Sequence, residues 1–323
     1  MSKKANPLPG DYFLNWAIPA QQSPVFPLEW SSWFSREAPV GVEIGFGNGE
    51  YLHEWSKRRP EWNLIGLEVS LASMERCQAR LCRNKVATAR PLYCDARFAL
   101  RELFAPDSID HIVMNYPDPW PKRRHDTRRL ISGNFTEVVA YALKTDCHYE
   151  LVTDQQFYAE EAAERFSESP FFETQPIEEN PERFVSTKYE RKCLEMVRGS
   201  FRLLERKIKS STPKRLLENP EMPHTFLKTE PAIDVVRELQ DFTHRDKRSL
   251  ATVKQIFKNT EQDGYLLKVV AKDADYKQSF LVLVKPHEDG RWIVKLDQGA
   301  LPYRTPAVKM AVWEIGNKLL EQL

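Results

Sequence analysis

Between residues 40 and 154, segments with two different periodicities of apolar and polar residues alternate. Short apolar runs of strand length are separated by longer segments in which apolar residues recur with the period of a helix. This alternation is typical of repeated βα units, which form a mostly parallel sheet with helices on both faces. It predicts strands at 40–45, 63–68, 90–95, 109–115 and 148–154, and helices at 51–59, 71–85, 96–104 and 135–144.

Each of these apolar runs ends in an acidic, amide or glycine residue. Because the carboxyl ends of parallel strands meet at one edge of a sheet, these polar residues are expected to gather there. Open α/β sheets bind their ligands in the crevice at that edge. The pattern therefore favours a binding site, and the alternative is that these residues only make turns.

The last third of the chain has a different pattern. Residues 210–225 carry three prolines and predict a linker between a first domain, 1–209, and a second domain, 226–323. Asp263-Gly264 and Asp289-Gly290 predict hairpin turns beside alternating segments at 278–284 and 291–296. With helices predicted at 232–245 and 307–323, the second domain is expected to be small and α+β.

Composition narrows the class of protein. With 323 residues, of which 41% are hydrophobic and 29% charged, the chain is expected to fold into packed domains. It has no apolar run of about 18 residues, and we expect a soluble, cytoplasmic protein without a membrane partner. Five cysteines and seven histidines without metal-ligand spacing predict free thiols and no metal. A net charge of +1 neither requires nor excludes a polyanionic partner.

The first predicted strand runs into a glycine turn, Glu43-Ile-Gly45-Phe-Gly47-Asn-Gly49, followed by a helix. Its spacing differs from the G-x-G-x-x-G of dinucleotide sites, and the carboxylate of Glu43 would repel a pyrophosphate. S-adenosylmethionine carries an ammonium and a sulfonium group, which acidic side chains attract. Its single carboxylate suits a helix N-terminus. This turn therefore favours S-adenosylmethionine as the cofactor.

Two further strand ends fit the same ligand. Glu68 ends the second strand, where a carboxylate can accept hydrogen bonds from both ribose hydroxyls. Asp95-Ala96 follows the third strand and is placed to reach the adenine amino group. The alternatives are a solvent-facing strand end for Glu68 and a helix N-cap for Asp95.

The segment after the fourth strand combines a rigid turn with positive charge. Asn115-Tyr-Pro-Asp118-Pro-Trp120 is fixed by its prolines and presents one carboxylate. Five cations follow within eight residues: Lys122, Arg123, Arg124, Arg128 and Arg129. Such a run is often only a solvated surface, but beside the predicted site it favours phosphates of an RNA whose target base is unstacked.

Residues 116–125, Tyr-Pro-Asp-Pro-Trp-Pro-Lys-Arg-Arg-His, closely resemble the signature of the bacterial tRNA (guanine-N7-)-methyltransferase family. Thr187-Lys188-Tyr189-Glu190 resembles the second motif of that family, and the resemblance spans about residues 35–207. It implies the class I S-adenosylmethionine-dependent methyltransferase fold, which is Rossmann-like. It also implies tRNA as substrate, with methylation at N7 of the guanine at position 46 in the variable loop.

The resemblance assigns roles to individual residues. It implies Asp118 as the catalytic residue. Tyr116 and Thr127 depart from the family pattern, which usually has Phe and a basic residue there. The implied cofactor-binding residues are Glu43, Gly45, Gly47, Glu68, Asp95, Ala96 and Asp118, and the implied substrate-binding residues are Lys122, Asp154, Thr187, Lys188, Tyr189 and Glu190.

The chemistry is consistent with these residues. Guanine N7 has a free lone pair and no proton, so attack on a methyl group needs no general base and positioning should dominate. The carboxylate of Asp118 could stabilise the positive charge that develops on the purine. The alternative is that Asp118 only shapes its turn. Trp120 could stack on a base or pack beneath the loop.

Three rival functions remain: an NAD-dependent oxidoreductase, an amino-group methyltransferase and a non-catalytic RNA-binding partner that keeps the fold. The glycine spacing argues against the first. The second would typically carry an (Asp/Asn)-Pro-Pro-aromatic turn, and the intact acidic residues argue against the third. The second domain could grip RNA or act as a structural cap, which its interspersed acids slightly favour. The oligomeric state, monomer or homodimer, stays open.

Overall fold

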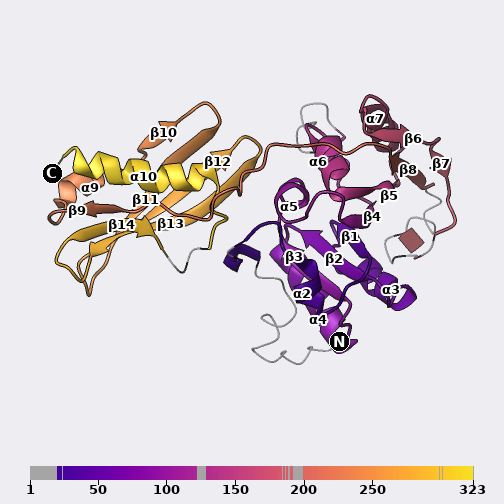
Figure 1. The fold of residues 1–323 in the computed structure, drawn as a ribbon, viewed down its shortest axis with the longest axis horizontal. Coiled ribbons are helices and arrows are strands. Elements are labelled where there is room, and N and C mark those ends of the chain that lie inside the picture. The colour runs from indigo at the N-terminus through magenta and orange to yellow at the C-terminus, as the bar shows by residue number, and fades with distance from the viewer. Residues whose placement is uncertain are drawn as a thin grey trace. The chain divides into compact units, whose positions relative to one another are not determined.

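The structure is a computed structural model that describes residues 20–23, 25–121, 129–183, 185, 187, 190–191, 199–297, 299 and 301–322. Contacts along the chain divide it into two compact units, Met1–Arg215 and Leu216–Leu323. Figure 1 labels their elements. Among the described residues, no helix has the length and apolarity needed to cross a membrane.

The first unit is built on an eight-stranded sheet. Its first five strands are parallel and follow the order β3-β2-β1-β4-β5, and β8, β6 and β7 are antiparallel to their neighbours. The bounds are β1 (Val40–Ile44), β2 (Asn63–Glu68), β3 (Ala89–Tyr93), β4 (Ile109–Asn115), β5 (Leu143–Thr153), β6 (Phe172–Thr174), β7 (Glu178–Glu179) and β8 (Phe201–Lys207).

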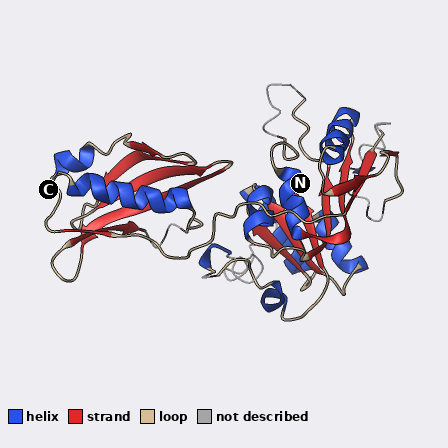
Figure 2. Ribbon diagram, turned by 45° about the horizontal axis from the view of Figure 1, so that its top comes forward, coloured by secondary structure: helices blue, strands red, loops and turns tan. Residues whose placement is uncertain are grey.

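Helices cover both faces of this sheet, as Figure 2 shows. Helices α3 and α4 share a core cluster with Val113 of β4. Helices α6 and α7 pack around Tyr149 of β5, which pairs with Ile112 and therefore lies on the opposite face. The bounds are η1 (Ala20–Gln22), α2 (Trp30–Phe34), α3 (Glu50–Arg58), α4 (Leu71–Arg83), α5 (Ala96–Glu102), α6 (Phe135–Ala142) and α7 (Gln156–Ser167).

The second unit is a six-stranded antiparallel sheet in the order β10-β11-β12-β13-β14-β9. Helices α9 and α10 pack on one face of it, where Val236 and Val312 join a core with Val269 and Val282. The bounds are β9 (Thr225–Leu227), α9 (Ile233–Arg237), β10 (Thr243–Arg245), β11 (Ser249–Lys258), β12 (Tyr265–Asp273), β13 (Tyr276–Pro286), β14 (Trp292–Leu296) and α10 (Pro306–Leu320).

The structure confirms the fold class and corrects several boundaries. The helix predicted at 135–144 ends at Ala142, because the chain is already extended at Leu143 and continues as β5. The helix predicted at 232–245 is wrong beyond Arg237, since Thr243–Arg245 pairs with β11 instead. Asp241, with a left-handed φ of 59°, lies in the turn between them. Helix α7 and strand β8 were not predicted from the sequence, and strands β11 and β12 were implied only by the hairpin turn predicted at Asp263-Gly264.

Both ends of the segment predicted as a linker, 210–225, form hydrogen bonds with neighbouring parts of the chain. Ser211 Oγ donates to the carbonyl of Glu137 at 2.5 Å, and Arg215 Nη2 donates to that of Glu102 at 2.9 Å. At the other end the carbonyl of Pro220 accepts from Arg304 at 2.8 Å. Its first residues therefore belong to the first unit and its last residues to the second.

Candidate active site

Two hollows open at the carboxyl edge of the parallel strands. One, of about 460 Å³, is lined by Glu43 and the glycine turn, and we call it the Glu43 hollow. The other, of about 440 Å³, is lined by the end of β2 and the loop after β4, and we call it the Asp118 hollow. Both have the volume of ligand sites. They share Gly45, Asn115 and Tyr116 and thus adjoin.

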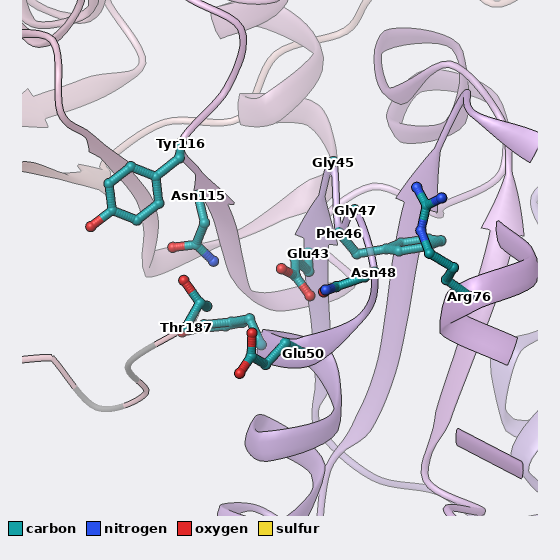
Figure 3. A pocket seen from close by; sticks show the side chains of 11 residues that line it. Glu43, Gly45, Phe46, Gly47, Asn48, Glu50, Arg76, Asn115, Tyr116 and Thr187 are labelled. Carbon is teal, nitrogen blue, oxygen red and sulfur yellow. The ribbon is translucent and has the colours of Figure 1, made fainter. Parts of the chain in front are cut away.

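The glycine turn leaves the Glu43 hollow open (Figure 3). Gly45 and Gly47 have left-handed φ angles of 70° and 55°, which a side chain would strain. Apart from their chain neighbours, no atom of the described residues lies within 4 Å of where their Cβ atoms would be. The turn leads into α3, whose N-cap is Gly49 and whose first residue, Glu50, also lines the hollow.

Glu43 is a strongly altered ionisable group at this edge. Its side chain is 2% exposed, and burial raises its pKa to about 8 despite the nearby Asn115 and Arg183. Its Oε2 has no hydrogen-bond partner among the described residues. Buried carboxyl oxygens are normally partnered, so this orphaned oxygen, on the wall of a hollow, is suited to a cationic ligand group.

The Asp118 hollow contains the other predicted cofactor residues. Its lining includes Glu68, Asp95, Ala96 and Asp118. Glu68 Oε2 accepts from the backbone N–H of Gly47 at 3.1 Å, which ties β2 to the glycine turn. Asp95 is the N-cap of α5 and accepts from the N–H of Phe98 at 3.1 Å, so the helix N-cap predicted as its alternative role is present. A cap and a place in the hollow are compatible, because a carboxylate can accept several hydrogen bonds.

The loop that carries Asp118 is held in an unusual conformation. Tyr116 and Trp120 have left-handed φ angles of 48° and 41°, which cost energy for side chains of this size. Arg129 donates two hydrogen bonds to the carbonyl of Trp120, at 3.0 and 3.3 Å, and pairs with Glu161 of α7. Arg129 is buried at 7% exposure, so it anchors the loop rather than facing solvent.

Two residues of the second motif, Thr187 and Glu190, form hydrogen bonds with each other. The N–H of Glu190 donates to Thr187 Oγ1 and the N–H of Thr187 donates to Glu190 Oε2, both at 3.2 Å. This reciprocal pair is a capping box. Thr187 also lines the Glu43 hollow, whereas Glu190 and Asp154 line neither hollow. Lys122, Lys188 and Tyr189, with Arg123, Arg124 and Arg128, lie outside the described residues.

Arg183 and Asn115 connect these parts and were missed as site residues. Arg183 Nη2 donates to Asn115 Oδ1 at 2.6 Å, and its guanidinium lies 3.6 Å from Glu190 Oε1. Its side chain is only 5% exposed. The polar end of β4 signalled Asn115, but nothing in the spacing connects Arg183 to it, because 68 residues separate them.

Comparison with known proteins identifies the family. A family model described as "Putative methyltransferase" matches residues 37–203. The chain is 39% identical to a tRNA (guanine-N(7)-)-methyltransferase of Thermotoga maritima over 94% of this chain and 96% of the relative. It belongs to the tRNA (guanine-N(7)-)-methyltransferase family. A second relative of the same name, from Coprothermobacter proteolyticus, is 32% identical over 94% of this chain and 93% of its own length.

This methyltransferase is also similar to a solved 16S rRNA (adenine(1408)-N(1))-methyltransferase with cosubstrate SAM from Catenulisporales acidiphilia. The TM-score is 0.43 at 12% identity, covering 59% of this chain and 95% of the other. Family membership makes the chain an enzyme with S-adenosylmethionine as its cofactor and replaces the oxidoreductase alternative. No group of three or more potential metal-ligating side chains occurs among the described residues.

Proposed function

We propose that this methyltransferase modifies N7 of guanine in tRNA, and that the guanine is the one at position 46 in the variable loop. The family relationship supports the reaction, because the relatives that match over more than nine tenths of the chain carry that activity in their names. The observation that carries the assignment of the site is the buried, unpartnered carboxyl oxygen of Glu43 beside the glycine turn.

The two hollows fit the two ends of the cofactor. When bound, S-adenosylmethionine supplies an electrophilic methyl group on a positively charged sulfur. Glu43 would attract the cationic methionine end, while Glu68 and Asp95 would accept hydrogen bonds from the ribose and the adenine. Gly45 and Gly47 let the backbone approach closely, and the N-terminus of α3 favours the carboxylate.

Asp118 is proposed as the catalytic residue. Guanine N7 already has a lone pair, so the protein's task is to orient the base and to stabilise the charge that it gains. Asp118 is exposed on the rim of its hollow, where a base could approach it. Substrate contacts are proposed for Lys122, Asp154, Thr187, Lys188, Tyr189 and Glu190.

The experiment combines purified protein, S-adenosylmethionine and unmodified tRNA, followed by mass spectrometry of the digested nucleosides. N7-methylguanosine should form, and Asp118→Ala should lower kcat by about 10²-fold or more, in line with loss of one preorganised charge. The affinity for S-adenosylmethionine measured alongside shows whether the variant still binds its cofactor.

A tRNA whose guanine 46 is replaced by adenine tests the position. Loss of methyl acceptance in that tRNA supports position 46, while unchanged acceptance assigns the methyl group to another guanine. If the unmodified protein binds tRNA tightly but transfers no methyl group, the non-catalytic RNA-binding alternative is correct instead.

A further inference from the structure

The antiparallel sheet of the second unit has one face packed under helices, and no helix of the described part of this unit covers the other face. Figure 2 shows α9 and α10 on the packed face. Paired residues on neighbouring strands point to the same side, and successive residues alternate. The pairing of Val269 with Phe280, both buried in the core under α10, therefore assigns Lys268 and Leu281 to the other side, which we call the open face.

The register assigns the remaining strand positions in the same way. On the open face the apolar and neutral residues are Phe226, Thr243, Leu250, Thr252, Gln255, Phe257, Leu266, Val270, Ser279, Leu281, Leu283 and Ile293. The charged residues there are Arg245, Lys268, Lys272, Lys277, Lys285 and Lys295. All six are cations.

The amino-acid composition of the second unit does not reveal this gathering of cations on one face. Residues 216–323 contain sixteen Asp and Glu and sixteen Lys and Arg, so the unit has no net formal charge with histidines neutral. No strand position of the open face is acidic. The nearby acids lie in the turns, at Asp263, Asp275 and Asp289, or just after β14, at Asp297. Six of the sixteen cations thus share one face of the sheet with no acidic strand position.

The six cations also lack carboxylate partners among the described residues of this unit. Other cations of the unit are paired, for example Arg237 with Asp234 at 2.9 Å and Arg291 with Asp289 at 2.6 Å. Lys268, Lys272, Lys277 and Lys285 are exposed. The half-buried leucines between them are of the kind that lysine stems cover while the ammonium groups stay in solvent.

One pair on this face opposes the stability of the fold. Lys272 and Lys277 are directly opposite each other on β12 and β13. Like charges at such positions destabilise a sheet. Arg245 lies in the same row, because it pairs with Leu250, which pairs with Lys272. A row of three cations without an acidic strand position on the same face is therefore better explained by an external polyanion than by the fold.

We propose that the open face binds the phosphate backbone of RNA, so that the second unit contributes tRNA affinity rather than only capping the fold. This proposal rests on the proposed function for the choice of tRNA as the polyanion. Lysines present point charges that neutralise phosphates without reading base sequence. The open face is expected to raise affinity and leave the methyl-transfer step unchanged.

The test compares two triple variants of the full chain that change net charge equally. The first is Lys268→Glu, Lys272→Glu and Lys277→Glu. The control is Arg237→Glu, Lys258→Glu and Lys318→Glu, whose positions are exposed or half-buried in the same unit and lie off the open face, on α9, at a core-side position of β11 and on α10. Binding of unmodified tRNA is measured by filter binding between 50 and 200 mM salt, together with kcat, KM for tRNA and melting temperature.

The open-face variant should bind tRNA about tenfold more weakly or worse, with the slope of log affinity against log salt reduced by about 2, as expected for three lost phosphate contacts. Its KM for tRNA should rise while kcat at saturating tRNA and the affinity for S-adenosylmethionine stay unchanged. The control should retain most of the affinity and the slope. Replacing the same three lysines by arginine should preserve binding.

Stability separates this role from a structural one. Lys277→Glu alone turns the like-charged pair with Lys272 into an attractive pair, so its melting temperature should stay or rise while tRNA affinity falls. Equal tRNA binding by the open-face variant and the control would overturn the proposal, even if methylation of tRNA is established. Absence of methylation by the unmodified protein is a separate result, which would overturn the proposed function instead.

Discussion

Burial changes the acidity of the Glu43 carboxyl group, which the position of Glu43 in the sequence does not indicate. Its pKa is raised to about 8, so at neutral pH most molecules hold this carboxyl group protonated. A cation placed beside it favours the ionised form and lowers its pKa again. Binding of the cofactor is therefore expected to displace a proton from Glu43.

The affinity for S-adenosylmethionine should consequently rise with pH. Between pH 6 and 8 we expect an increase of up to about tenfold per pH unit, levelling off above 8, because only the ionised carboxylate attracts the cations of the cofactor. Calorimetry in two buffers of different ionisation enthalpy measures both affinity and proton release. Glu43→Gln should flatten the profile, and an identical slope in that variant would exclude Glu43 as its source.

The sequence predicts the positions of the site residues better than their chemical environments. Strand ends and the family motif led to Glu43, Glu68, Asp95 and Asp118, and all four line the two hollows. The altered pKa of Glu43 could not be predicted, because it depends on burial by residues distant in the sequence. Arg183 was missed for the same reason, since its partners come from β4 and β5.

Among the structural elements, the loop of Asp118 depends on a neighbouring helix. Arg129 connects the carbonyl of Trp120 to Glu161 of α7, and its guanidinium lies 5.6 Å from the ring centre of Phe157. The positively charged run suggested a phosphate-binding role for Arg129. Burial against α7, which was not predicted as a helix, gives it this anchoring contact instead.

Arg129→Ala should therefore release the loop. We expect kcat to fall by about tenfold to 10²-fold through misplacement of Asp118, with the affinity for S-adenosylmethionine nearly unchanged. Arg165→Ala is the matched control, since Arg165 pairs with the same Glu161 at 2.8 Å, whereas Arg129 is the donor to the carbonyl of Trp120. Steady-state kinetics at saturating tRNA compares the two, and equal kcat values would contradict the anchoring role.

The end of the first unit depends on a buried carboxylate. Glu102 is fully buried in α5, with Arg101 Nε at 2.6 Å and Arg215 Nε at 3.7 Å. Arg215→Ala removes one partner of this charge and the hydrogen bond to its carbonyl, and it should lower the free energy of unfolding by about 1–3 kcal/mol. Lys57→Ala, which removes an exposed ion pair with Glu54, should cost less than about 1 kcal/mol. Urea denaturation measures both, and equal losses would argue against the buried contact.

Elements differed in how well the sequence predicted them. The five parallel strands were found because strands buried on both faces give continuous apolar runs. The antiparallel strands β11 and β12 mix lysines with apolar residues, since one face lies under helices and the other does not. Strand β10 has only three residues, and its pairing with β11 is tertiary information that no local pattern provides.

Across the whole molecule, the two units have separate cores. Since S-adenosylmethionine is proposed to bind only the first unit, it should stabilise that unit alone, by about 2.7 kcal/mol at one hundred times its Kd. Differential scanning calorimetry with and without cofactor should then show one transition that moves and one that does not. A single transition that shifts as a whole would mean that the units unfold together.

The cations on one face of the second unit also affect how the molecule approaches polyanions and charged surfaces. With a net charge of +1 and an isoelectric point near 7.6, the chain would be classed as almost neutral. The six cations on one side of its sheet are nevertheless expected to orient the second unit towards a polyanion before any contact forms. Retention on a cation-exchange resin slightly above pH 7.6 would reveal this orientation. A measurement of net charge cannot, because it does not show where the charges lie.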